Sequence, residues 1–126
     1  MKESNPFLTT IICVVLIFTA CQSNKFDNEI LIGSWEVLEW KIEKTGKSVN
    51  NKLDMKFESE KNYSIDYGSK NEIGKYWIVG DFLHTIENEQ TEKKVKILKL
   101  VTDTMEIQMN RGGHLERVVL IKKKNK

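Results

Sequence analysis

Cysteine and proline are almost absent from this sequence of 126 residues. The single proline is Pro6, so no later segment contains the residue that cannot donate a hydrogen bond within a β-sheet. The only cysteines are Cys13 and Cys21, and residues 22–126 contain no thiol. That part of the chain therefore cannot form an internal disulfide, and it offers no cysteine ligand to a zinc ion.

An excess of charge of one sign is also missing. The chain has 20 lysine and arginine residues against 18 aspartate and glutamate residues, which gives a formal net charge of +2 at pH 7. A charge so close to balance argues against a nucleic-acid partner, because proteins that bind nucleic acid usually carry a strong positive electrostatic field.

Residues with catalytic or metal-binding chemistry are few. The two histidines, His84 and His114, fall on different predicted strands and have no cysteine beside them, so a zinc site lacks ligands. The sequence shows no Ser–His–acid spacing, no nucleophile elbow and no phosphate-binding loop. We therefore predict that the protein is not an enzyme and uses no metal and no cofactor.

The chain begins with an apolar run that is too short to span a membrane. Residues 7–18, FLTTIICVVLIF, are almost all apolar, whereas a membrane-spanning helix needs ~20 such residues. Lys2 precedes the run and the small residue Ala20 follows it, as in a secretory signal peptide. Residues 1–20 are predicted to form this signal, and the alternatives are a buried helix or an uncleaved short anchor.

The residues FTAC at 18–21 resemble the lipobox of bacterial lipoproteins. The resemblance implies cleavage between Ala20 and Cys21 and attachment of lipid to the Cys21 thiol. Several acyl chains hold a protein to a membrane far more firmly than one chain does. We therefore expect an exported cell-envelope protein, anchored by lipid to the outer membrane of a Gram-negative bacterium, with residues 21–29 as the lipidated tether. A Cys13–Cys21 disulfide is the alternative use of these residues.

From residue 30 onward, apolar and polar residues alternate between regular turn signals, which indicates short β-strands. Eight segments fit this pattern: 34–42, 53–57, 63–67, 75–79, 82–87, 95–101, 104–109 and 114–122. The short connections between them favour antiparallel neighbours, because parallel strands need crossovers of a dozen residues or more. The alternation slips at Val37–Leu38 in the first segment, and a β-bulge there would restore it.

These strands predict an all-β fold, an eight-stranded antiparallel up-and-down barrel, preceded by the signal-peptide helix and the short tether. A barrel closes both sheet edges, and eight strands leave an interior just wide enough for side chains or one small ligand. A sandwich of two sheets is the alternative.

The residues IGSW at 32–35 resemble the Gly-x-Trp signature of lipocalins, and FDNEI at 26–30 could form the helical turn that precedes it. The resemblance implies that Trp35, two residues after Gly33, closes one end of the barrel and that a basic residue of the last strand packs over its ring. The matching residue is Arg117. Such a contact contributes about 1–2 kcal/mol in a partly desolvated site. The alternative places Arg117 on the outer face in solvent.

Two further motifs, GKYWIVGDFL at 74–83 and LVTDTM at 100–105, are similar to motifs of small lipocalin-like lipoproteins of Bacteroidetes-type bacteria. With the lipobox and the Gly-x-Trp strand, this resemblance spans residues 21–126. It implies a lipocalin-like β-barrel domain over residues 30–126.

Aromatic and apolar side chains on the predicted strands suggest that a small hydrophobic ligand binds in the barrel mouth. The candidate ligand-binding residues are Trp40, Met55, Phe57, Tyr63, Tyr76, Ile107 and Met109. The alternative is that these side chains fill a solid core, in which case the barrel would act as a protein-interaction or inhibitor module with a partner protein in the envelope.

Overall fold

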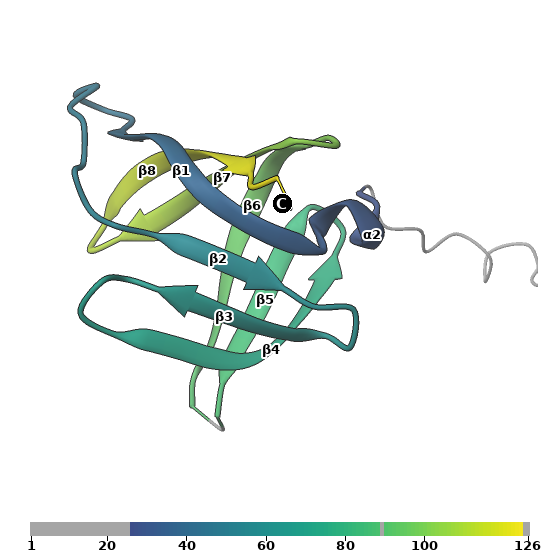
Figure 1. The fold of residues 1–126 in the computed structure, drawn as a ribbon. Coiled ribbons are helices and arrows are strands. Elements are labelled where there is room, and N and C mark those ends of the chain that lie inside the picture. The colour runs from purple at the N-terminus through teal and green to yellow at the C-terminus, as the bar shows by residue number, and fades with distance from the viewer. Residues whose placement is uncertain (1–25, 89, 125–126) are drawn as a thin grey trace, which may run out of the picture.

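The computed structural model describes residues 26–88 and 90–124, so the predicted signal peptide, its cleavage site and Cys21 lie outside the described residues. One short helix precedes eight strands (Figure 1). Their bounds are α2 Asn28–Leu31, β1 Gly33–Ile42, β2 Asp54–Phe57, β3 Asn62–Asp66, β4 Asn71–Val79, β5 Phe82–Glu87, β6 Glu92–Leu100, β7 Thr104–Arg111 and β8 His114–Lys122.

The eight strands form one closed antiparallel barrel in which each strand pairs with the next. The ring closes because β1 also pairs with β8, from Trp35 opposite Lys122 to Ile42 opposite Glu116. This topology confirms the predicted up-and-down barrel and excludes the sandwich. Every strand has two neighbours, so the barrel has no edge strand.

Two strands begin three or more residues earlier than the sequence predicted. Strand β4 begins at Asn71 and not at residue 75, and β6 begins at Glu92 and not at residue 95. The segment GSKNEIG resembled a turn because of its glycines. However, Gly74 lies within β4, where a Cβ atom would collide with the carbonyl oxygen of Ile86 on β5. This glycine permits a close approach of two strands and does not mark a turn.

The bulge predicted in β1 is present. The register of β1 against β8 shifts between Val37 and Glu39, and the side chain of Leu38 is exposed to solvent. Trp35 and Trp40 are separated by an odd number of positions, yet both are buried. The extra residue turns the strand so that both rings point into the barrel.

The barrel has two different ends, which we call the floor and the mouth. The floor is the end where β1 begins and β8 ends, and the mouth is the end where β1 ends and β8 begins. The described chain therefore enters and leaves at the floor, where the C-terminal end lies close to α2 (Figure 1). There the backbone N–H of Lys123 donates a 2.8 Å hydrogen bond to the carbonyl oxygen of Ser34.

Helix α2 and the start of β1 close the floor. Leu31 and Trp35 are both fully buried, and the indole Nε1 of Trp35 donates a 2.8 Å hydrogen bond to the carbonyl oxygen of Leu31. The ammonium of Lys122 lies 5.0 Å from the centroid of the Trp35 ring and donates a 2.6 Å hydrogen bond to the carbonyl oxygen of Ile30. Gly33 has a φ of +134° and leaves room for this lysine, since a Cβ atom there would lie 3.3 Å from its side chain.

The prediction that Arg117 packs over Trp35 is wrong, because the cation in that place is Lys122. Arg117 lies on the outer face, where its guanidinium forms 3.2 Å ion pairs with Glu43 and Glu106. The residues of β8 that point inward are those of even number, and Val118 and Leu120 are fully buried. Since VVLI at 118–121 is apolar without interruption, the sequence alone does not reveal which parity faces the core.

Candidate functional site

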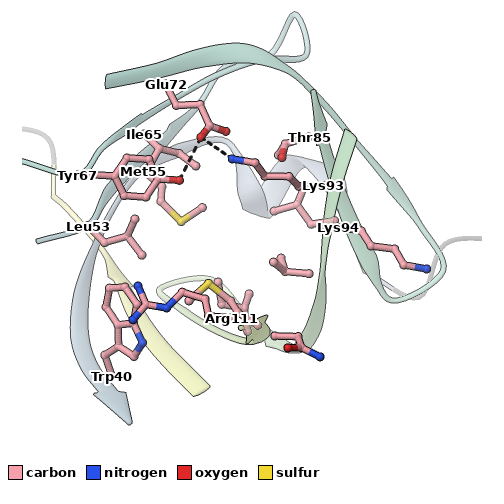
Figure 2. A pocket seen from close by; sticks show the side chains of 15 residues that line it. Trp40, Leu53, Met55, Ile65, Tyr67, Glu72, Thr85, Lys93, Lys94 and Arg111 are labelled. Atoms are coloured by element: carbon pink, nitrogen blue, oxygen red, sulfur yellow. Dashed lines mark hydrogen bonds and ion pairs between the residues drawn. The ribbon is translucent and has the colours of Figure 1, made fainter. Parts of the chain in front are cut away.

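The half of the barrel next to the mouth contains a cavity of about 360 Å³. Figure 2 shows the side chains that line it. Its apolar wall consists of Trp40, Leu53, Met55, Ile65, Leu83, Val95, Ile107 and Met109. This volume falls within the range of small-molecule sites, about 300–1,000 Å³. A larger depression of about 580 Å³ lies beside β1 and residues 48–54, but it is more open and mostly polar.

The structure divides the predicted ligand-binding residues into two groups. Trp40, Met55, Ile107 and Met109 line the cavity. Phe57, Tyr63 and Tyr76 are buried outside its lining, and the rings of Phe57 and Tyr76 meet edge to face with centroids 5.0 Å apart. The hydroxyl of Tyr76 donates a 2.7 Å hydrogen bond to the carbonyl oxygen of Glu58, in the turn after β2 at the floor. The barrel is therefore filled at the floor and hollow at the mouth.

A buried carboxylate, that of Glu72 at the start of β4, forms one side of the cavity. The Glu72 side chain is only 1% exposed. The hydroxyls of Tyr63 and Tyr67 both donate hydrogen bonds to it, and the ammonium of Lys93 contacts its Oε1 at 3.1 Å. In Figure 2 the dashed lines from Tyr67 and Lys93 converge on this carboxylate.

These contacts fix the charge states of the group. Burial of Glu72 opposes ionisation, but the hydrogen bonds from Tyr63 and Lys93 outweigh it and hold the pKa of Glu72 below its ordinary value. Burial, reinforced by the negative charge of Glu72, raises the pKa of Tyr67 to about 12, and the same two causes raise the pKa of Tyr63. At neutral pH the site therefore holds one carboxylate and two protonated phenols.

The sequence reasoning missed Glu72 because it assigned residues 68–74 to a turn. In the structure Glu72 lies opposite Ile65 of β3, with its side chain on the inner face. Tyr76 and Ile78 are buried on the same strand. Extending their even-numbered parity back through Gly74 would have placed Glu72 inside the barrel.

A second buried carboxylate, that of Glu116 on β8, lies near Trp40 on another side of the mouth. The indole Nε1 of Trp40 donates a 2.7 Å hydrogen bond to Glu116, whose side chain is 5% exposed. The Nε of Arg111 lies 3.1 Å from the same carboxylate, and the guanidinium carbon is 5.2 Å from the centroid of the Trp40 ring. Arg111 thus contacts both a carboxylate and an aromatic face, a combination suited to its planar guanidinium.

The histidines lie away from the cavity lining. His84 is on the outer face, where its ring stacks on that of Trp77 at 5.4 Å and its Nδ1 lies 2.8 Å from Glu92. His114 is exposed at the start of β8. Among residues 26–88 and 90–124, no three His, Cys, Asp or Glu side chains gather in a way that could hold a metal ion. In the same part of the chain, no helix has the length and apolarity needed to cross a membrane.

Comparisons with known proteins identify two solved structures with a similar fold. No known protein family matches the sequence, and no curated protein resembles it. Among solved structures, a lipocalin-like protein from Bacteroides uniformis ATCC 8492 has a TM-score of 0.57 at 16% identity, covering 75% of this chain and 99% of that one. An uncharacterized protein from Bacteroides eggerthii DSM 20697 has a TM-score of 0.58 at 14% identity, covering 74% and 99%. At these identities the similarity shows a shared lipocalin-like fold and nothing finer.

Proposed function

We propose that this protein is a non-catalytic binding protein of the bacterial cell envelope that holds a small hydrophobic molecule in the mouth of its barrel. The observation that carries this proposal is the hollow of about 360 Å³ with an apolar wall, above a floor occupied by buried aromatic side chains. A solid-core barrel that acts only through its outer surface has no use for such a cavity. The hollow therefore favours a ligand over the interaction or inhibitor module.

The first test is the mass of the protein isolated from its own host. In native mass spectrometry we expect the wild-type protein to carry an additional small molecule. Met109→Trp replaces a flexible side chain of the cavity wall with a bulky indole ring. This variant should lose the bound molecule, because the indole takes the volume that the ligand needs. Leu115→Trp adds the same ring on the outer face, where Leu115 is 47% exposed, and should leave the ligand in place. A bare protein mass in the wild type, or equal loss in both variants, would contradict the proposal.

We also propose that lipid on Cys21 anchors the protein to a membrane, which is the outer membrane if the host is Gram-negative. The FTAC motif after an apolar run supports this proposal, and the bacterial source of both solved neighbours is consistent with it. An anchor of several acyl chains is effectively permanent, since each buried methylene adds about 0.8 kcal/mol.

The anchor is tested by comparing the two cysteines. Cys21→Ala should abolish labelling by a radioactive fatty acid and should release the protein from membranes without detergent. Cys13→Ala removes the other thiol, which lies within the proposed signal, and should leave both labelling and membrane attachment unchanged. If the Cys21→Ala protein still incorporates fatty acid, or if the wild type never does, there is no lipid on Cys21.

A further inference from the structure

Among the described residues, three cations line the cavity, and two of them, Lys93 on β6 and Arg111 on β7, lie on neighbouring strands and pair with buried carboxylates; the third is Lys94. The ladder between β6 and β7 ends with Lys96 opposite Gln108. Lys93 precedes Lys96 by three residues and Arg111 follows Gln108 by three, so both cations stand at the mouth, beyond the end of the β6–β7 ladder. Both line the cavity. In Figure 2 Lys93 points into the cavity, whereas Lys94 beside it points away.

Each of these cations is held by a buried carboxylate. The Lys93 side chain is 57% exposed while its partner Glu72 is 1% exposed, and Arg111 is 51% exposed while Glu116 is 5% exposed. The glutamates are thus buried in the wall, whereas their cationic partners are about half exposed to solvent. Holding a long side chain in place before a ligand arrives reduces the entropy lost when the ligand binds.

The charged groups that offer free hydrogen-bonding capacity to a ligand at the mouth are mainly donors. Glu72 already accepts from Tyr63, Tyr67 and Lys93, so its oxygens are occupied. An ammonium has three N–H groups and a guanidinium has five, whereas Glu72 and Glu116 engage one of them in each cation. Hydrogen bonds between such donors and an anion are about twice as strong as those between neutral groups.

The size of the cavity limits the apolar part of the ligand. A water-sized group takes about 30 Å³ in a liquid, so a volume of about 360 Å³ holds roughly a dozen such groups. One aliphatic chain of about ten carbons fits this space, and the two long chains of a membrane phospholipid do not.

We propose that the ligand is a single-chain amphiphile whose apolar chain fills the cavity and whose anionic head group, a carboxylate or phosphate, binds between Lys93 and Arg111. This inference rests on the proposed binding function and specifies the chemical class of the ligand. Both the chain-sized hollow and the pair of anchored cations are required for it.

The test compares head groups on one chain length by isothermal titration calorimetry of the purified full-length protein. Decanoate, methyl decanoate and decyltrimethylammonium carry a negative, a neutral and a positive head on similar chains. We expect decanoate to bind about tenfold or more tightly than methyl decanoate, and decyltrimethylammonium to bind most weakly. Raising the salt concentration should narrow these differences, because the head group lies at the solvent boundary.

Variants of the two cations assign the preference to the mouth. Lys93→Gln combined with Arg111→Gln should reduce decanoate affinity to that of methyl decanoate, and thermal unfolding should verify that this variant is folded. Lys94→Gln removes the charge of the neighbouring lysine. Because the Lys94 ammonium lies over the Phe82 ring and points away from the cavity, this variant should leave decanoate affinity unchanged. Lys93→Arg keeps the charge and should preserve the preference.

The possible outcomes separate the two proposals. Equal affinity for decanoate and methyl decanoate would overturn the anionic head group and leave the binding function standing. Absence of binding by all three compounds would count against the binding function itself. Binding to vesicles of a two-chain anionic phospholipid but not to decanoate would overturn the single-chain ligand.

Discussion

Trp35→Ala is expected to lower the free energy of unfolding by about 3–5 kcal/mol, the usual effect of truncating a buried aromatic side chain. Trp35 is 0% exposed, and its indole packs at the floor between α2 and the core of the barrel. Alanine would leave a cavity there and would remove the donor to Leu31. Urea unfolding followed by circular dichroism measures the change, and the midpoint of thermal unfolding should fall by at least about 12 °C.

Three further substitutions show whether this loss belongs to the floor. Trp77→Ala truncates a tryptophan of β4 that is not fully buried and stacks on His84, and it should destabilise the protein much less. Lys122→Met should lower the free energy of unfolding by about 1 kcal/mol, because it removes the ammonium that donates a hydrogen bond to the carbonyl oxygen of Ile30. Arg117→Met breaks only surface ion pairs and should change stability by at most about 1 kcal/mol. A larger effect at Arg117 than at Lys122 would contradict the assignment of Lys122 as the closing cation.

Glu72→Ala should destabilise the protein by about 2–3 kcal/mol at neutral pH, because it removes the acceptor of the buried Tyr63 hydroxyl and the partner of Lys93. The free energy of unfolding from urea titrations measures this effect. Glu106→Ala is the matched control, since Glu106 pairs with Arg117 on the outer face and its loss should change stability by less than about 1 kcal/mol.

The Glu72→Ala effect should depend on pH in a defined direction. The folded-state pKa of Glu72 lies below the ordinary value of 4.5, so its ionised form stabilises the fold above pH 4.5. The wild type loses this contribution as the pH falls through the lowered pKa, whereas Glu72→Ala has nothing to lose. The stability difference between the two proteins should therefore be largest at neutral pH and should shrink in acid.

Urea titrations from about pH 3 to pH 7 check this dependence. Glu72→Gln keeps the shape of the side chain and one oxygen acceptor, and it should also lack the acid-dependent part of the wild-type curve. A stability difference that stays constant over this range would mean that folding does not lower the pKa of Glu72, which would contradict the charged network around this carboxylate.

The arrangement of strands could be predicted from the sequence because the alternation of side chains is a local property. Inward residues of a half-buried strand are mostly apolar, and short connections favour antiparallel neighbours. Even the bulge was predictable, since Trp35 and Trp40 could not otherwise share a face. The lipocalin-like fold then follows from closure of the eight strands.

The polar half of the site could not be predicted in the same way. Glu72 and Glu116 occupy inward positions although charged side chains usually lie in solvent, and they are tolerated because tyrosine, tryptophan and cationic partners satisfy them. Those partners come from other strands, so only the register of the closed barrel brings them together. The same holds for the division of the barrel into a packed floor and a hollow mouth, which depends on the summed volume of side chains from many strands.

Because the chain enters and leaves at the floor, the barrel has a fixed polarity relative to its point of attachment. If Cys21 bears lipid, the seven Cα–Cα steps from it to the start of α2 at Asn28 span at most about 25 Å. The floor would then stand over the bilayer, and the opening would look away from it. Cargo would have to arrive from the aqueous side or from a facing membrane, and could not slide in from the leaflet that holds the anchor.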